Sequence, residues 1–285
     1  MTAGVASLGS ARWAVVQRRV LLYVVLGIFV VLFLGPVYVL LVTSLKTFQD
    51  VSLSEMWVFP RAVSLEAFRA ALIRLGPNLR NSFVLVIPAT LVTAAIGSIN
   101  GYVFSKWRFR GSNIVFALIL FGMFIPYQAI LIPLVQFLRT IGLYGNLGGL
   151  ILTHVIYGIP ITTLMFRNFY AEIPDELLEA GYMDGLELFG VYRRIMLPLS
   201  APGLVVVVIW QFTSVWNDFL FAVTITQRPG VQPITVALQN LAGSQVVEWN
   251  VQMAGALIAA VPTLIIYILL GKYFIRGMLA GSVKG

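Results

Sequence analysis

Very few residues of this 285-residue chain could do acid–base, nucleophilic or metal chemistry. The chain has no cysteine and a single histidine, His154, which excludes thiolate and multi-histidine metal sites. It contains no G-x-x-x-x-G-K-[ST] phosphate loop, no nucleophile elbow and no H-E-x-x-H motif. The ionisable groups expected inside apolar segments are His154 and Asp218. The sequence therefore predicts a protein that is not an enzyme, with no catalytic residue, no metal site and no cofactor bound by this chain.

A polar path through a membrane is the chemistry that these two residues could serve. An ionisable residue inside a membrane helix is a functional candidate by default, although one neighbouring helix can also satisfy a neutral imidazole. Amides and aromatic rings alternate in the segment that ends at Asp218, and such groups can bond to and stack on hydroxylated substrates. The alternative is an aromatic belt at the membrane surface with a carboxylate near water. The candidate path residues are His154, Gln211, Trp216, Asn217 and Asp218.

The densest group of charges lies at residues 172–198, between long apolar runs. Pro174 suits the first turn of a helix, and the acidic residues that follow it are favoured there by the helix dipole. Asp184-Gly185 is a turn signal, so a second helical piece is expected over 186–197, closed by Pro198. Two short helices bent at Gly185 would form a compact knob that fits a groove in a partner.

The rest of the chain has the composition of an integral membrane protein. Hydrophobic residues make up 59% of the chain and charged residues 11%, against about a quarter charged in soluble domains. Six charge-poor runs can each supply the roughly 20 residues that a helix needs to cross lipid, and they are too long for barrel strands. The fold class is therefore all-α integral membrane, with membrane lipid around it. The expected helices span residues 20–43, 82–104, 114–136, 149–168, 203–225 and 252–272.

The basic residues indicate how the chain is oriented. More of them fall on the side of the N-terminus, and Lys106, Arg108 and Arg110 crowd one short loop there. The positive-inside rule then places both termini and the loop 172–201 in the cytoplasm. The net charge of +8 does not indicate nucleic-acid binding, because the basic residues lie at the ends of apolar runs and form no patch.

The expected domain organisation follows from this topology. It consists of a cytoplasmic segment 1–19, a transmembrane domain 20–276 with outside loops 46–81 and 227–251, and a cytoplasmic tail 277–285. A short amphipathic helix is expected to begin after Ser64 on the outer surface.

Glycines and prolines within the spans predict close helix packing at one place and helix kinks at others. Gly97-xxx-Gly101 has the spacing that lets helix backbones approach in lipid, although glycine is also simply tolerated in membrane helices. Pro126, Pro133 and Pro160 are expected to kink their helices, either to line a cavity or as ordinary packing kinks.

The charged island matches a family motif: E-A-A, three residues, G, nine residues, I-x-L-P. Here it reads Glu179-Ala180-Gly181, Gly185, Ile195 and Leu197-Pro198, with every interval kept and Asp184 before the glycine in agreement. In this the chain resembles the membrane subunits of binding-protein-dependent ABC importers. Gly181 departs from the motif's second alanine. Because glycine costs roughly 1 kcal/mol in a helix relative to alanine, the knob is expected to be locally looser.

Weaker matches extend over nearly the whole chain. Among them are Trp216-Asn217-Asp218-Phe219 and the ending Gly281-Ser282-Val283-Lys284-Gly285. They are similar to the shorter, six-span subunit of maltose-type carbohydrate importers.

The resemblance implies a type I ABC importer permease in the cell (inner) membrane of a bacterium or archaeon. A second, homologous permease would pair with it as a heterodimer, and two ATPase subunits would hold ATP and Mg. The coupling residues that dock in an ATPase cleft would be Glu179, Ala180, Gly181, Asp184, Gly185, Ile195, Leu197 and Pro198.

An extracytoplasmic sugar-binding protein would deliver a mono-, di- or oligosaccharide, with Gly243, Ser244 and Gln245 as its contact. One alternative is a permease of the same kind for a polyol or a glycerol-phosphate. An alternative of a different class is a stand-alone channel or secondary transporter. Such a secondary transporter usually has several intramembrane carboxylates or histidines, and this chain has at most two.

Overall fold

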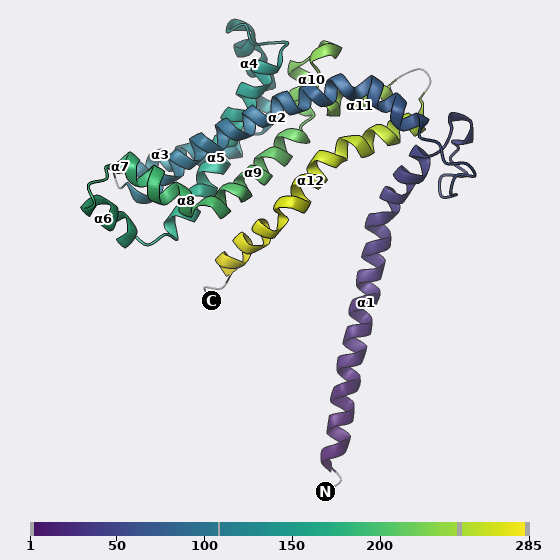
Figure 1. Ribbon diagram of the computed structural model, residues 1–285, viewed down its shortest axis with the longest axis horizontal. Helices are drawn as coiled ribbons and strands as arrows, with labels where there is room; N and C mark the ends of the chain where they lie inside the picture. Colours follow the sequence, from purple (N-terminus) through teal and green to yellow (C-terminus); the bar gives the residue numbers. More distant parts are fainter. Residues whose placement is uncertain (1–2, 108, 244–246, 283–285) are drawn as a thin grey trace. The chain divides into compact units, whose positions relative to one another are not determined.

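The computed structural model describes residues 3–107, 109–243 and 247–282, and every regular element in these ranges is a helix (Figure 1). The all-α prediction is therefore confirmed. The α-helices are α1 (Ala3–Ser44), α2 (Glu66–Lys106), α3 (Ser112–Phe121), α4 (Tyr127–Thr140), α5 (Leu147–Ala171), α6 (Glu176–Met183), α7 (Leu188–Val191), α8 (Leu197–Leu199), α9 (Ala201–Trp216), α10 (Leu220–Ile225), α11 (Ile234–Ala242) and α12 (Trp249–Ser282). The short turns of other helical types are η1 (Phe48–Asp50), η2 (Gly122–Phe124), η3 (Tyr192–Met196) and η4 (Pro229–Val231).

Four helical segments are long and apolar enough to cross a membrane: Val16–Ser44 in α1, all of α2, all of α5, and Trp249–Gly271 in α12. Two bent pairs pass the same test together. Ser112–Phe124 and α4 are bent by 100°, and Leu188–Leu199 and α9 by 77°. With each pair counted as one span, the described residues contain up to six candidate spans, the number that the sequence predicts.

Two of the expected spans are nevertheless not continuous. The expected helix 114–136 is interrupted before α4, because Pro126 is extended, with φ −60° and ψ 128°, and lacks the N–H that would continue the ladder. The expected helix 203–225 ends at Trp216, and α10 starts a new helix at Leu220. Pro160 behaves differently, since α5 runs through it as one helix.

The short amphipathic helix predicted after Ser64 is also wrong as a separate element. Its residues are the first turns of α2, which runs on through Pro77 and Pro88 for 41 residues. Near Pro77, side chains of α2 bind the loop that leads into α11. Asn78 Nδ2 donates to the carbonyl of Gln232 at 2.8 Å, and Ser82 Oγ accepts from the N–H of Ile234 at 2.8 Å.

The chain forms two compact units, residues 1–71 with 246–257 and residues 72–245 with 258–285. In the first unit, the apolar side chains of α1 from Val16 onward are largely exposed. Lys46 is buried there, and its Nζ donates to the carbonyl of Glu55 at 2.6 Å. Asn250 Nδ2 donates to the carbonyl of Lys46 at 3.1 Å. The loop after α1 is therefore fixed within its own unit by buried polar contacts.

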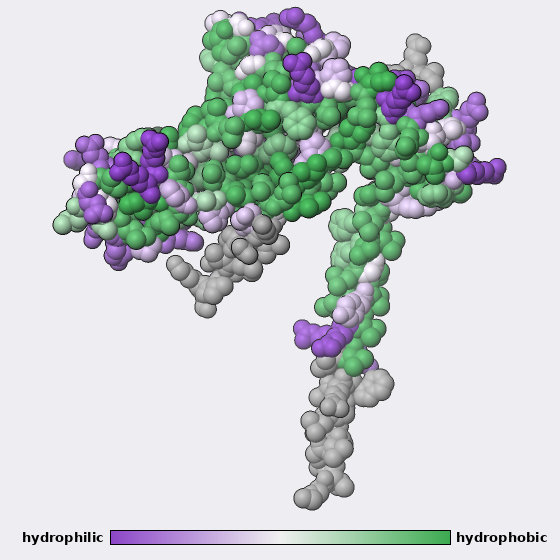
Figure 2. All heavy atoms as spheres, in the orientation of Figure 1, coloured by the Kyte–Doolittle hydropathy of each residue, from purple (hydrophilic) through white to green (hydrophobic). Residues whose placement is uncertain are grey.

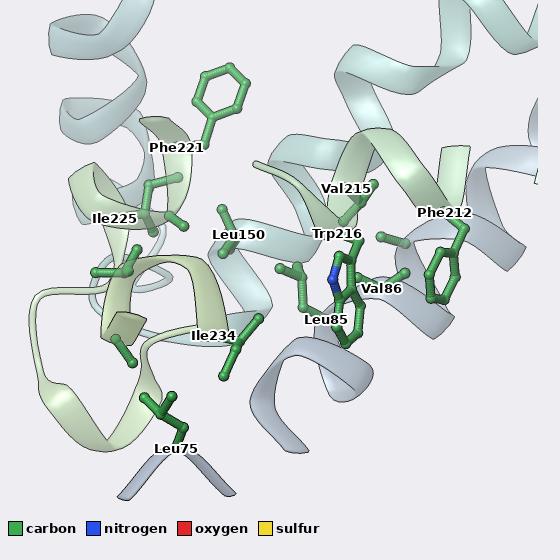
Figure 3. Close-up of a cluster of buried hydrophobic side chains, with 14 of the residues drawn as sticks. Leu75, Leu85, Val86, Leu150, Phe212, Val215, Trp216, Phe221, Ile225 and Ile234 are labelled. Atoms are coloured by element: carbon green, nitrogen blue, oxygen red, sulfur yellow. The ribbon is translucent and has the colours of Figure 1, made fainter. Parts of the chain in front are cut away.

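The second unit has a large apolar core between α2, α5, α9, α10 and α11 (Figure 3). Trp216 lies in this core near Leu85 and Val86 of α2. Its ring stacks on Phe212 with centroids 5.6 Å apart, and its Nε1 donates to the carbonyl of Ala259 at 3.0 Å. On the outside of this unit, apolar side chains cover the surface over α2 and α9, whereas hydrophilic ones gather around α6 and α7 (Figure 2).

Helices α2 and α5 pack with their backbones almost in contact. A Cβ built on Gly97 would collide with the Thr162 side chain, and one on Gly101 would lie 2.5 Å from Phe166 Cβ and 2.7 Å from the backbone nitrogen of Arg167. The structure therefore confirms Gly97-xxx-Gly101 as a close-packing motif rather than a pair of merely tolerated glycines.

Replacing Gly101 by alanine should destabilise the protein, because the new methyl group meets backbone atoms that cannot give way. We expect a loss of about 1–3 kcal/mol, the usual range for overpacking, seen as a lower unfolding temperature in detergent. The matched control is Gly271→Ala in α12, where nothing lies within 4 Å of the added Cβ. Equal unfolding temperatures for the two variants would contradict the close α2–α5 packing.

Candidate functional site

The charged island folds as the predicted knob with a sharp turn after α6. Gly185 has a φ of +80°, in the left-handed region that favours glycine. Its N–H donates to the carbonyl of Tyr182 at 3.0 Å, and the N–H of Leu186 donates to the carbonyl of Gly181 at 3.0 Å. This pair of bonds is the Schellman motif, which satisfies the last carbonyls of a helix. The turn predicted at Asp184-Gly185 is confirmed.

The motif residues divide into an outward set and an inward set. Glu179, Ala180, Asp184, Gly185 and Pro198 are exposed on the surface of the knob. The inward set consists of Gly181, which is buried, and Ile195 and Leu197, which are half-buried. The outward residues are free to meet a partner, and the inward ones hold the two pieces of the knob together.

Gly181 packs more tightly than the sequence led us to expect. A Cβ at this position would lie 2.7 Å from Ile195 Cδ1 and 3.3 Å from Val191 Cγ2. The missing methyl group therefore lets α6 lie directly on the second helical piece. The expectation of a looser knob considered helix propensity alone, whereas the structure shows that this glycine also makes room for Ile195.

The second piece of the knob differs in detail from the predicted helix 186–197. It starts at Leu188, passes through α7, the five-residue π-helical turn η3 and α8, and ends at Leu199. Pro198 lies inside α8, so it does not close the piece as predicted. The 77° bend falls at Ser200, immediately before α9. Turns of the π type are frequent at functional sites.

Lys106, the last residue of α2, fixes the base of α6. Its Nζ donates to the carbonyl of Ile173 at 2.6 Å and to Asp175 Oδ1 at 2.5 Å. The Lys106 side chain is only 6% exposed, whereas that of Asp175 is 66% exposed. This ammonium group is therefore held at the point where the chain leaves α5 and enters the knob.

A cavity of about 280 Å³ lies between the helices of the second unit. Three of the five predicted path residues line it: His154 on α5, Gln211 on α9 and Asp218 in the break after α9. Gly158 makes room for Gln211, since a Cβ there would collide with its amide. Gln211 Nε2 donates to the carbonyl of His154 at 3.4 Å. The further lining residues are Gly122, Met123, Tyr127, Tyr157, Gly158, Ile161, Trp210, Ser214 and Phe221.

His154 and Asp218 face each other in this cavity. His154 Nε2 lies 3.4 Å from Asp218 Oδ2, with side chains 8% and 12% exposed. The contact lacks the geometry of a hydrogen bond, so the buried Nε2 has no hydrogen-bond partner in the described part of the chain. The carboxylate is also structural, because it accepts from the N–H groups of Phe221 at 3.3 Å and Ala222 at 2.9 Å. From the position just before the N-cap Phe219, it thereby satisfies two of the first N–H groups of α10.

Aromatic rings beside this pair were missed by the sequence reasoning. Tyr127, Tyr157 and Phe221 meet with ring centroids 5.3–5.6 Å apart, and the His154 ring lies 5.8 Å from that of Phe221. Helical spacing could have predicted one of these rings, since Tyr157 follows His154 by three residues and shares its face of α5. Tyr127 follows the bend at Pro126, where a kink was expected, and Phe221 follows the break after Trp216, which the sequence did not predict.

The other predicted path residues lie outside this cavity. Trp216 points into the apolar core, and Asn217 is exposed and does not line the cavity. Of the residues predicted to meet a binding protein, Gly243 directly follows α11 and is exposed, whereas Ser244 and Gln245 fall outside the described residues. Within the described ranges there is no cluster of three or more metal-ligating side chains.

The described residues thus form an all-helical, multi-pass membrane protein with a cavity between its helices and an exposed, charged knob. Residues 96–279 match the family described as binding-protein-dependent transport system inner membrane component. The chain belongs to this family, and it is therefore a membrane permease component of an ABC transporter rather than an enzyme.

Relatives and solved structures agree with this assignment. The chain is 47% identical to a probable ABC transporter permease of Pyrococcus horikoshii, over 94% of this chain and 98% of the relative. It is 34% identical to a xylose/arabinose import permease of Haloferax volcanii, with 92% of each chain covered. A chain of a bacterial ABC transporter that imports the acidic polysaccharide alginate shares the fold, with a TM-score of 0.79 at 20% identity over 90% of this chain and 96% of that one. The type I importer fold is thereby shown.

Replacing Gly185 by alanine should open the turn of the knob. A residue with a Cβ pays roughly 1–2 kcal/mol in the left-handed conformation, so amide exchange at Leu186 should speed up roughly 5- to 30-fold. Hydrogen exchange with mass spectrometry over residues 176–192 measures this. The matched control is Gly190→Ala in α7, where the new Cβ meets only Leu186 side-chain atoms at 3.4 Å or more. The same exchange rate in both variants would rule out a strained position at Gly185.

Proposed function

We propose that this chain is a translocation subunit of an ATP-driven importer of carbohydrate. The observation that carries the proposal is the surface of the knob. Glu179, Ala180 and Asp184 are exposed around a rigid turn at Gly185, on a chain that has no phosphate loop of its own. A membrane path without an energy source needs a partner, and this compact, charged surface is suited to a groove in an ATPase subunit. ATP and Mg would be bound by two such subunits.

The lining of the cavity supports a hydroxylated solute. Rings of Tyr127, Tyr157 and Phe221 offer flat apolar faces, while Gln211 and Asp218 offer an amide and a carboxylate. A few convergent polar groups among aromatic ones are typical of sites that orient a small ligand. The named functions of relatives point the same way, since those from Haloferax volcanii and Saccharolobus solfataricus are import permeases for xylose/arabinose and for glucose.

The charge of the cavity favours a neutral sugar over a glycerol-phosphate. The described lining residues include the carboxylate of Asp218 and no lysine or arginine. A phosphate group would meet the Asp218 carboxylate with no lysine or arginine in the described lining to pair with it, and like charges that are desolvated together are unfavourable. An uncharged polyol fits the same chemistry and remains the alternative substrate within this transporter class.

A second permease would complete the path. The cavity volume of about 280 Å³ in this chain is at the lower limit of ligand sites, which run from about 300 to 1,000 Å³. A homologous subunit facing it would enlarge and close the site, as in a heterodimer. An extracytoplasmic sugar-binding protein would deliver the solute, with Gly243, Ser244 and Gln245 as the proposed contact. The knob and both termini would then lie in the cytoplasm, in accordance with the distribution of basic residues.

Reversing the charge at Glu179 should abolish ATP-driven uptake while the protein still inserts in the membrane. Glu179 is exposed, so Glu179→Lys changes the docking surface without disturbing the core. Transport and substrate-stimulated ATPase activity are measured in proteoliposomes that contain both permeases and the ATPase. Gly185→Pro should have the same effect by removing the N–H that closes the turn. Normal stimulated ATPase activity in both variants would refute the docking role, and uptake by this chain alone would favour a channel or secondary transporter.

Replacing Gln211 by alanine should slow uptake of the neutral sugar. Loss of a hydrogen bond to a bound hydroxyl typically costs about 0.5–1.5 kcal/mol, which corresponds to roughly 2- to 13-fold in affinity. The matched control is Asn217→Ala, which removes an amide of the exposed residue that does not line the cavity. Uptake kinetics of the two variants give the comparison. An effect of Asn217→Ala as large as that of Gln211→Ala would contradict this cavity as the path.

A further inference from the structure

Four buried hydroxyl groups meet at the root of the knob. Ser98 Oγ of α2 lies 2.7 Å from Tyr170 Oη of α5 and 2.9 Å from Tyr192 Oη of η3. Ser200 Oγ, at the 77° bend before α9, lies 3.3 Å from Tyr170 Oη and donates to the carbonyl of Leu197 at 2.9 Å. These four residues, here called the hydroxyl joint, connect two membrane helices with the first residue of the π-helical turn and with the bend at Ser200.

The hydroxyl joint is enclosed by apolar and aromatic groups. Tyr170 and Ser200 are fully buried, Ser98 is 1% exposed and Tyr192 is 8% exposed. The ring of Tyr102 lies against those of Tyr192 and Tyr170, with centroids 5.3 and 6.1 Å away. Tyr102 also donates from its Oη to the carbonyl of Leu188 at 3.0 Å. Water is thus kept from hydroxyls that bond to one another.

Hydrogen bonds depend on distance and direction, so the hydroxyl joint fixes the position of the knob relative to α2 and α5 more narrowly than an apolar contact would. An unpaired hydroxyl buried away from water costs roughly 1–3 kcal/mol, so a sliding movement of the knob across this surface would break bonds that nothing replaces. Apolar side chains of similar volume would let the knob shift slightly against α2 and α5 at little cost in free energy. The hydroxyl joint therefore favours movement of the knob together with α2 and α5 over movement past them.

The same two helices reach the cavity. His154 and Tyr170 both lie on α5, sixteen residues apart, which is about 24 Å of continuous helix. On α2, Ser98 lies five residues beyond Thr93. The methyl group of Thr93 packs against Gly158, where an added Cβ would come within 2.6 Å of it. Because α2 and α5 are locked at Gly97 and Gly101, a tilt imposed at the knob reaches the cavity without a flexible segment between them.

We propose that Ser98, Tyr170, Tyr192 and Ser200 are positioning residues that make the knob and the α2–α5 pair move as one body, so that movement of the ATPase is converted into opening of the cavity. The proposal rests on the function proposed above. It assigns these hydroxyls to coupling rather than to docking, since all four are buried and none belongs to the exposed motif surface.

The test removes single hydroxyls and keeps the rings. In proteoliposomes with the complete transporter, Tyr192→Phe and Ser98→Ala should lower the number of sugar molecules imported per ATP hydrolysed roughly fivefold, the factor that matches about 1 kcal/mol for one lost hydrogen bond. Assembly with the ATPase and ATP turnover should remain near those of the unmodified complex. The double variant should be no worse than Ser98→Ala alone, because that change already removes the bond to Tyr192. Tyr144→Phe is the matched control, since its ring lies against Arg139, outside the hydroxyl joint.

Three results would overturn the proposal or its basis, and they are distinguishable. If import per ATP in Tyr192→Phe equals that of the unmodified complex, the hydroxyl joint has no role in coupling. If import and ATP turnover fall together in proportion to the amount of assembled complex, its role is stability alone. If the unmodified complex shows no ATP-driven sugar uptake, the function proposed above fails, whatever the variants do.

Discussion

The close packing of α2 against α5 is the constraint on which the rest of the second unit depends. Gly97 and Gly101 bring the two helices so near that a single added carbon would collide with Thr162 or with the backbone at Arg167. In lipid, where apolar side chains gain little by leaving their surroundings, such close van der Waals contact is a main source of helix association. The cavity is lined from α5 and from segments packed on this pair, and the knob is attached to its far end.

The knob illustrates how one motif serves two physical purposes. Its exposed positions, among them Glu179 and Asp184, offer charge for the proposed contact with an ATPase, whereas Gly181 and Ile195 decide how closely the two helical pieces lie. The spacing between Glu179 and Pro198 is therefore constrained by the packing inside the knob as well as by the shape of its exposed surface. A change in the interval would displace the αL turn at Gly185 from the surface that it shapes, and it would also separate Ile195 from α6.

The sequence predicted the features that depend on local residue type. The apolar runs predicted the helices, and Asp184-Gly185 predicted the turn of the knob. Gly97-xxx-Gly101 predicted a close-packing surface that the structure confirms. It predicted a kink at Pro126, where the chain bends by 100°, but not the break after Trp216. That break depends on tertiary contacts and on the Asp218 carboxylate, which accepts from the first N–H groups of α10. Pro77, in turn, is tolerated within α2 beside Asn78, which binds a distant loop. Of the path residues, His154, Gln211 and Asp218 share a cavity, but the indole of Trp216 could be assigned to the core only after the face of α9 was known.

The central claim is that the knob is the point at which a partner ATPase grips this permease, and cross-linking tests it most directly. The chain has no cysteine, so Met183→Cys places a single thiol on the knob at a side chain that is 88% exposed. A reagent that joins thiols to lysines should link this residue to the ATPase subunit in membranes that contain the whole transporter. Leu53→Cys, at a position 90% exposed in the loop expected outside, should give no such product. No cross-link from position 183, or an equal yield from position 53, would contradict the account.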